Sequence, residues 1–152
     1  RAAANLAQPM LAPLWAAGLS FSKCHAERLV PNDPSLKQIF TGEEFARGAR
    51  LWTHGYDFYS MMRPVIGTWY GGDKGSYGHG SWRHNHTEMQ ASQARLGTLF
   101  EAPGSDQSPA ARAALGSFAL GTRRTLEQYV AFSGVDPRIR GAAGSGGNCV
   151  VR

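Results

Sequence analysis

The sequence has few cysteines and no long hydrophobic run. Cys24 and Cys149 are its two cysteines, too few for a disulfide framework or a cysteine-based metal site. No window has the apolar length of a transmembrane helix, and no secretory signal peptide is visible. The chain begins at Arg1 rather than at a methionine. The sequence alone therefore leaves the compartment open, because a targeting or anchoring segment upstream would decide it.

The familiar phosphate-binding and nucleophile motifs are also missing. The sequence contains no Gly-x-Gly-x-x-Gly, no P-loop and no Gly-x-Ser-x-Gly. Its five aspartates, Asp33, Asp57, Asp73, Asp106 and Asp136, never stand two residues apart. These absences exclude a phosphate-cradling loop and an Asp-x-Asp metal site from this stretch of chain.

The charge is positive but not concentrated in one segment. Sixteen Lys and Arg residues against eleven Asp and Glu give a net charge of +5, without the block of like charges that marks a nucleic-acid-binding tail. This balance suits an acidic small molecule such as a sugar nucleotide. The alternative is a basic nucleic-acid-binding module that uses the basic and aromatic residues of SYGHGSWRHNH, residues 76–86. Steep salt dependence of binding would favour that alternative.

Glycine and proline are abundant, which favours loops. Nineteen glycines and eight prolines predict a loop-rich α/β or α+β domain rather than a helical bundle. Runs of β-branched and aromatic residues predict short strands, and apolar residues at helical spacing predict flanking helices. The expected strands are 15–23, 56–60 and 63–70, and the expected helices are 42–53, 87–100, 110–118 and 125–133. The glycine-rich loop 71–86 indicates a functional loop or disorder.

Two of the later helices carry clear start signals. Thr87 is placed to cap the helix 87–100, whose stripe of Met89, Leu96, Leu99 and Phe100 is expected in the core. Thr125 and Gln128 have the spacing of a capping box for the helix 125–133, and Gly134 is placed to end that helix.

The most informative segment is GEEFARGARLWTHGYDFYS, residues 42–60. It begins with two adjacent carboxylates. Thr41 and Glu44 have the spacing of a capping box, and Phe40 and Phe45 are placed for a hydrophobic staple around it. A purely structural role as a cap is therefore one interpretation of Glu44, and catalysis is the other.

The rest of that helix also allows a structural interpretation. Glu43, Arg47 and Arg50 fall along one face, which favours a solvated ion pair with the glutamate in the favourable N-terminal position. His54 is expected near the last carbonyls and Gly55 just beyond the end of the helix. On the residues alone, this structural interpretation of Glu43 is favoured over catalysis.

Three histidines lie in or next to the glycine-rich loop. His84 and His86 are close enough in sequence to bind one metal ion, and His79 precedes them. A metal site normally needs three or four ligands, and the sequence offers no Cys or carboxylate at a fixed spacing to complete one. Loop histidines without a role are the simpler interpretation, and a metal site is the alternative.

Several segments, taken in order, resemble one family of GlcNAc-transferases. This family includes the hydroxyproline-modifying enzyme that acts on an SCF ubiquitin-ligase adaptor. The segments are WAAGLSFS, VPNDP, FTGEEFARGARLWTHGYDFYS, RPVIGTWY and LGTRRTLEQYVAFSGVD, which together cover most of residues 13–136. The most specific part is GEE, followed by an Ala/Arg-rich turn and then by WTHGYDFYS.

The resemblance implies a fold and a reaction. The fold is an α/β domain, the C-terminal, acceptor-side half of a GT-A glycosyltransferase. This half would occupy residues 1–140, with the nucleotide-binding half upstream and a flexible Gly/Ser-rich tail at 141–152. The implied reaction transfers N-acetylglucosamine from UDP-GlcNAc to a protein hydroxyl, with hydroxyproline as the implied acceptor, with retention and with Mn²⁺ or Mg²⁺. The implied compartment is the cytoplasm, or the Golgi if an anchor lies upstream.

The resemblance also implies site residues. It places Glu43 and Glu44 at the sugar pocket, where their separation of about 100° around the helix gives them different tasks. We expect Glu43 to bind sugar or acceptor hydroxyls and Glu44 to cap the helix and support the pocket. The other implied substrate-binding residues are Trp15, Gly18 and Ser20 in the first expected strand and His54, Tyr56 and Asp57 after the helix.

One position departs from the family pattern. Members usually carry a histidine that resembles a metal ligand after the short strand that follows the Tyr-Asp element, and the aligned residue here is Thr68. The loop histidines His79, His84 or His86 would have to replace it, since imidazole suits such metals. The other possibility is that this branch has lost the ligand.

Overall fold

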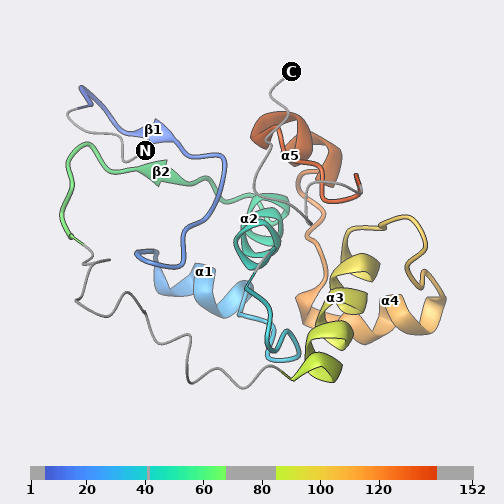
Figure 1. Ribbon diagram of the computed structural model, residues 1–152. Coiled ribbons are helices and arrows are strands. Elements are labelled where there is room, and N and C mark those ends of the chain that lie inside the picture. The colour runs from blue at the N-terminus through green and yellow to red at the C-terminus, as the bar shows by residue number, and fades with distance from the viewer. Residues whose placement is uncertain (1–5, 41, 68–84, 140–152) are drawn as a thin grey trace.

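A computed structural model describes residues 6–40, 42–67 and 85–139. The elements in these ranges are β1 (Met10–Leu11), α1 (Cys24–Leu29), α2 (Glu43–Thr53), β2 (Tyr59–Ser60), α3 (His86–Leu99), α4 (Pro109–Leu115), the 3₁₀ helix η1 (Gly116–Phe118) and α5 (Leu126–Ser133). Figure 1 shows helices gathered around α2 and a short two-stranded ribbon beside them. The described part therefore mixes helix and strand, with helix dominant.

The ribbon pairs two segments that are far apart in the sequence. β1 and β2 are antiparallel, with Met10 opposite Ser60 and Leu11 opposite Tyr59. The pairing continues beyond the strands, because the Ala12 N–H donates to the Phe58 carbonyl at 2.9 Å. The strand expected over 56–60 is thus confirmed only at its last two residues.

The other two expected strands are wrong where the structure describes them. Residues 15–23 form turns and irregular chain, and residues 63–67 form no strand. The remainder of the 63–70 segment lies outside the described residues. Strand propensity needs a pairing partner to become a strand. Residues 15–23 instead close on themselves, since the Trp15 indole N–H donates to the Ser20 hydroxyl at 2.9 Å. The sequence analysis also missed α1.

The helix α2 is the centre of the packing. Its Phe45, Ala46 and Ala49 join a core with α3, α4 and α5, made by Leu96, Leu99, Phe100, Leu115, Leu126 and Tyr129. On its other side Leu51 packs with Ala26 and Val30 at α1, and Trp15, Tyr56 and Phe58 cover this second cluster. Because α2 contacts both clusters, it is buried nearly all round.

The later helices follow the sequence closely, with one different cap. The capping box of α5 is confirmed, and Gly134 ends that helix in a left-handed conformation. The cap of α3 is Asn85, whose side chain accepts the Glu88 N–H at 3.2 Å, so the prediction that Thr87 is the cap is wrong. Asn outranks Thr at this position. The expected apolar stripe of α3 is confirmed as core at Leu96, Leu99 and Phe100, with Met89 half-buried.

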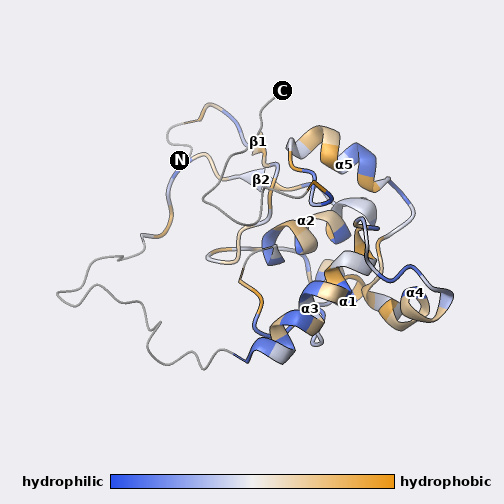
Figure 2. Ribbon diagram, turned by 45° about the vertical axis from the view of Figure 1, so that its right-hand side comes forward, coloured by the Kyte–Doolittle hydropathy of each residue, from blue (hydrophilic) through white to orange (hydrophobic). Residues whose placement is uncertain are grey.

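Hydrophobic side chains are not confined to the core. Figure 2 shows hydrophilic and hydrophobic residues on α2, α3 and α5 alike. Around the ribbon, large apolar side chains are exposed at Met10, Leu11, Tyr59, Met61, Met62, Val65 and Ile66. Within the described ranges, no helix has the length and apolar character that crossing a bilayer requires.

Candidate functional site

A cavity of about 160 Å³ opens beside the first two turns of α2. Three segments build its wall. Trp15 and Ala17 come from the segment after β1, Asn32, Asp33, Leu36 and Ile39 from the turn after α1, and Glu43, Ala46, Arg47 and Arg50 from α2. Two residues implied by the resemblance, Trp15 and Glu43, therefore share one cavity.

Glu43 is the carboxylate of α2 that lines this cavity. It is half-buried, whereas Glu44 is exposed. Burial raises the pKa of Glu43, and the adjacent charge of Glu44 raises it further. The two glutamates thus occupy different environments, as expected from their angle around the helix.

The predicted start of α2 is wrong in its details. The N-cap residue is Gly42, with φ of 100°, and no side chain makes a cap hydrogen bond. Thr41 lies outside the described residues. Phe40 is 75% exposed while Phe45 is buried, so these two do not form the expected staple. Glu44 therefore does not act through a capping box, because the N-cap glycine has no side-chain oxygen to complete one.

Arg47 and Arg50 are not on a solvated face. Both are buried, at 5% and 2% exposure. Arg47 donates to the Val30 carbonyl and pairs with Glu27 rather than with Glu43. Arg50 donates to the Pro31 carbonyl at 2.7 Å. The expected ion pair with Glu43 is replaced by bonds that hold the turn after α1 against α2.

A second ion pair lies at the same wall. Asp33 accepts from Arg95 Nε at 2.6 Å, and Arg95 reaches it from α3. The Arg95 guanidinium also donates to the Ala114 carbonyl at 3.0 Å. Asp33 is therefore fixed in an ion pair, which leaves Glu43 as the carboxylate of the cavity outside any ion pair among the described residues.

Of the three residues that the resemblance implicates in the segment after β1, only one lines the cavity. Trp15 is half-buried and lines the cavity, but Gly18 and Ser20 are exposed and do not line it. Ser20 contributes indirectly, because its hydroxyl accepts the Trp15 indole N–H. A Cβ at Gly18 would meet no atom within 4 Å. The structure therefore gives no close approach that would explain Gly18.

His54, Tyr56 and Asp57 lie at the opposite end of α2 from Glu43. Eleven residues of helix separate Glu43 from His54, which is about 16 Å at 1.5 Å per residue. His54 Nδ1 lies 2.7 Å from the Arg50 carbonyl, and Gly55 follows with φ of 95°, as expected for the end of the helix. These three residues do not join the Glu43 cavity.

Tyr56 and Asp57 have packing partners of their own. The Tyr56 ring lies 5.7 Å from the His25 ring, and Asp57 pairs with Arg124 at 2.7 Å. Arg124 also lies over the Trp52 ring, 4.3 Å from its centroid. These contacts tie the segment after α2 to α1 and to the segment before α5.

The histidines provide no metal centre in the described residues. His79 and His84 lie outside those residues, and His86 is exposed in the first turn of α3. Across residues 6–40, 42–67 and 85–139, no group of three His, Cys, Asp or Glu side chains is placed to hold a metal ion. The described residues therefore do not form a metal site by themselves.

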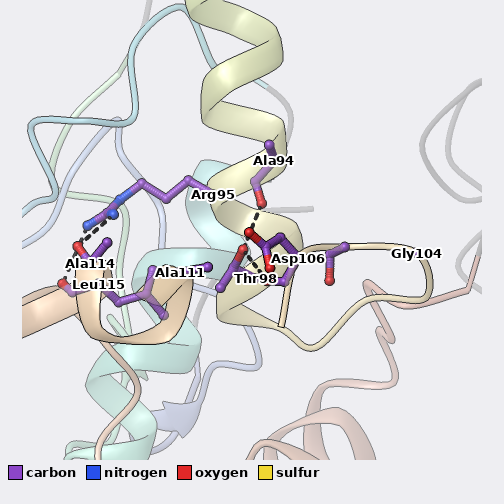
Figure 3. A pocket seen from close by; sticks show the side chains of 9 residues that line it. Ala94, Arg95, Thr98, Gly104, Asp106, Ala111, Ala114 and Leu115 are labelled. Atoms are coloured by element: carbon purple, nitrogen blue, oxygen red, sulfur yellow. Dashed lines mark hydrogen bonds between the residues drawn. The ribbon is translucent and has the colours of Figure 1, made fainter. Parts of the chain in front are cut away.

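A larger cavity of about 370 Å³ lies between α3 and α4 (Figure 3). Its lining is mostly small or apolar, with Ala94, Ala111, Ala114 and Leu115 among the residues drawn. The polar groups in it are already bonded. The Thr98 hydroxyl donates to the Asp106 carbonyl at 2.9 Å. This cavity contains none of the residues that the sequence implicated.

Four polar lining residues were not predicted from the sequence: Asn32, Asp33, Arg47 and Arg50. A usable signal existed in α2, where Ala46, Gly48 and Ala49 surround the two arginines. Small residues on all sides of a helix indicate close packing by neighbours, so an arginine among them is expected to be buried. The segment VPNDP, residues 30–34, was noted only as part of the resemblance, without its role in the wall of the cavity.

Comparison with known families supports the resemblance at the level of the family. A model for glycosyltransferases, described as "Glycosyltransferase (GlcNAc)", matches residues 1–139. The chain belongs to this GlcNAc glycosyltransferase family, which implies transferase chemistry with a sugar and an acceptor as partners. A search of curated proteins gave no match, and a search of solved structures gave none either.

Proposed function

We propose that this chain is the acceptor-side part of an enzyme that transfers N-acetylglucosamine from UDP-GlcNAc to a protein hydroxyl, with hydroxyproline as the acceptor and with retention. The observation that carries the proposal is the position of Glu43. It is half-buried and lies with Trp15 in one cavity. A carboxylate free of ion pairs accepts hydrogen bonds from sugar or acceptor hydroxyls, and an indole offers a flat apolar face to a pyranose ring.

The proposal also covers parts of the enzyme that these residues do not supply. The fold would be the C-terminal half of a GT-A domain over residues 1–140, followed by the tail 141–152. A separate nucleotide-binding half with an Asp-x-Asp element would hold the diphosphate. The described residues offer neither a phosphate-binding loop nor a metal ligand set. In the proposed enzyme, another part would therefore supply both.

Paired substitutions in a full-length enzyme test the proposal. Glu43→Gln removes the charged acceptor of hydrogen bonds, and each such bond contributes about 1.5–3 kcal/mol. We therefore expect kcat/KM for transfer to fall by about 10- to 100-fold, with little change in thermal stability. Glu44→Gln is the matched control, because Glu44 is exposed. Small and equal effects of the two substitutions would return both glutamates to a structural role.

The divalent metal has a separate test. Mn²⁺ or Mg²⁺ would neutralise the developing charge on the leaving diphosphate, and the proposed ligands in this chain are His79, His84 and His86. If one of them binds the metal, its replacement by alanine raises the manganese concentration needed for half-maximal transfer. An unchanged metal requirement in all three single variants rules out this replacement of the ligand expected at Thr68.

The segment that carries the basic nucleic-acid-binding alternative, residues 76–86, lies mostly outside the described residues, and five of the described arginines are already bonded within the protein. Arg47, Arg50 and Arg95 are turned into the protein and bonded to carbonyls or carboxylates. Arg124 pairs with Asp57, and Arg138 pairs with Asp136 at 2.8 Å. Phosphate contacts require basic side chains that are free to reach a backbone.

A further inference from the structure

The cavity beside α2 has two arginines whose hydrogen bonding is incomplete. Arg47 and Arg50 both line it and are buried to more than nine-tenths. Their terminal nitrogens donate to the Val30 and Pro31 carbonyls. The Nε–H of each is buried without a hydrogen-bond partner among the described residues. A buried donor that is left unpaired costs about 1–3 kcal/mol, so two such donors beside one cavity indicate a ligand that accepts hydrogen bonds.

The positive and negative side chains around the cavity are equal in number, but not all of them form ion pairs. Arg47 pairs with Glu27, and Arg95 pairs with Asp33. Arg50 has only carbonyl partners, at Pro31 and Ser117. Burial, together with the charges of Arg47 and Arg95, lowers the pKa of Arg50 to about 10, although the charge of the nearby Asp33 acts in the opposite direction. Arg50 remains charged at neutral pH, and one positive charge of the wall is therefore left without an ion-pair partner.

Glu43 lines the same cavity but does not supply that partner. No ion pair joins it to a described arginine within the range of a salt bridge. Glu43 and Arg50 are seven residues apart on α2, which is about 10 Å along the helix axis. The cavity thus has a carboxylate at the first turn of α2 and a guanidinium without an ion-pair partner about two turns further along the helix.

We propose that this cavity, at Arg47 and Arg50, binds a carboxylate side chain of the protein acceptor. A carboxylate carries one negative charge and two oxygens, which matches one unpaired charge and two unpaired N–H donors. The inference rests on the proposed function for the acceptor being a protein. It goes beyond that function because the acceptor would be recognised by an acidic residue in addition to the hydroxyl that receives the sugar.

The size of the cavity favours a side chain over a nucleotide. Sites for drug-sized molecules usually measure about 300–1,000 Å³, whereas this cavity measures about 160 Å³. A diphosphate would also bring more negative charge than the single unpaired arginine offsets. The donor nucleotide is therefore the less suitable source of the oxyanion, and it is tested as a competing outcome.

Binding of short peptides to the 152-residue chain tests the inference without any transfer reaction. The probes are acetyl-Ala-Asp-Ala-amide and its isostere acetyl-Ala-Asn-Ala-amide, followed through the NMR signal of the Trp15 indole N–H. Trp15 lines the cavity, so its signal reports occupancy. We expect the Asp peptide to bind at least tenfold more tightly than the Asn peptide. Equal affinities would overturn the inference, as would a Trp15 shift produced by UDP and not by the Asp peptide.

Three variants test whether the preference for the Asp peptide arises at this cavity. Arg50→Gln should abolish the preference for Asp, whereas Arg112→Gln, an exposed position on α4, should retain it. Because Arg50→Gln also loses bonds to Pro31 and Ser117, Ala17→Leu provides a second test. Ala17 is an exposed lining residue, and a larger side chain there narrows the cavity with both arginines intact. An undiminished preference for Asp in Ala17→Leu would place the carboxylate elsewhere and overturn the inference.

The outcomes for the two proposals are separable. Selective binding of the Asp peptide, with no transfer by the full-length enzyme, would remove the proposed reaction and leave the carboxylate site. Loss of transfer in Glu43→Gln, with no selectivity for Asp, would support the reaction and overturn the carboxylate site.

Discussion

Folding moves the pKa of Glu43 in the opposite direction from that of Asp136. The Asp136 pKa is lowered chiefly by hydrogen bonds from the Arg138 side chain, so Asp136 contributes stability that is lost as pH falls through its folded pKa. The Glu43 pKa is raised by burial and by Glu44. Whatever Glu43 contributes is therefore present below its unfolded pKa and lost as pH rises through its folded pKa.

This sign gives a test of the environment of Glu43. Glu43→Gln removes the carboxyl that becomes charged as pH rises, so the free energy of unfolding of the variant, relative to that of the parent, should increase from about pH 4 to about pH 7. The expected increase is about 0.5 kcal/mol or less, as for most partly exposed positions. Urea unfolding at both pH values measures it, with Glu101→Gln on the exposed Glu101–Arg112 pair as control. A decrease would show that Glu43 is stabilised in its charged form.

Gly48 is required by the packing of α2 against α5. A Cβ there would lie 2.2 Å from the Tyr129 hydroxyl oxygen, and that hydroxyl donates to the Pro13 carbonyl at 2.9 Å in the core. Replacing Gly by Ala inside a helix normally stabilises by about 1 kcal/mol. Here we expect Gly48→Ala to destabilise by about 1–3 kcal/mol through overpacking.

Thermal or urea unfolding checks this reversal, with Gly18→Ala as the matched control. A Cβ at Gly18 would meet no atom within 4 Å, so we expect no loss of stability there. A Gly48→Ala variant as stable as the parent would mean that Tyr129 has room to move, and would contradict the close packing of α2 and α5.

At the scale of elements, the helices with local start signals were predictable, whereas α1 and most of the strand residues were not. The helices α2, α4 and α5 have local signals, such as the Thr125–Gln128 capping box and Pro109 at the first turn of α4, which act within a few residues. β1 pairs with β2 across about fifty residues, and no local pattern specifies that partner. Segment 15–23 has the composition of a strand, but no strand within the described ranges pairs with it.

At the cap of α3 the N-cap rule was correct but was applied to the wrong residue. Asn85 accepts the Glu88 N–H, whereas Thr87 lies inside the helix and is exposed. We expect Asn85→Ala to cost about 1 kcal/mol of stability and Thr87→Ala to cost less than about 0.5 kcal/mol. The two free energies of unfolding measure this directly. The reverse order would restore Thr87 as the cap and move the start of α3 by two residues.

In the candidate site, too, a residue within a recognisable segment was predictable, whereas contacts between segments distant in the sequence were not. Glu43 was predicted from the resemblance, and the structure places it in a cavity with Trp15. The other wall of that cavity comes from the turn after α1, held by the buried Arg47 and Arg50. A solvated helical face and a buried one contain the same arginines at the same spacing, so spacing alone could not reveal their burial.

At the scale of the whole molecule, the ribbon and the apolar side chains around it are poorly covered by the rest of the described residues. The ribbon has only two strands, and isolated two-stranded ribbons are marginally stable in water. Large apolar side chains around it, including Met10, Tyr59 and Val65, are exposed. Exposed apolar surface beside unpaired strand edges favours association. Under the proposed function, the nucleotide-binding half of the enzyme would cover this surface.

The exposed surface predicts how residues 1–152 behave when produced alone. We expect them to associate, and we expect Met62→Ser combined with Val65→Thr to reduce association in analytical ultracentrifugation. Ile139→Thr is the control, because Ile139 is also exposed but follows α5 rather than β2. An equal reduction by the control would mean that hydrophobicity in general, and not the surface around the ribbon, drives association.

The same chain should bind UDP-GlcNAc poorly and show no transfer. A retaining transferase must stabilise the diphosphate as its charge develops, and that stabilisation is usually a large part of catalysis. The described residues offer no set of metal ligands. The cavity at Glu43 is about 160 Å³, smaller than the usual sites for drug-sized molecules, and in the larger cavity between α3 and α4 the Arg95 and Thr98 side chains are already bonded to the protein. Calorimetric titration of the chain with UDP-GlcNAc and manganese tests this. Micromolar binding by a monomeric chain would show that the nucleotide site lies within these residues, and it would move the proposed domain boundary with it.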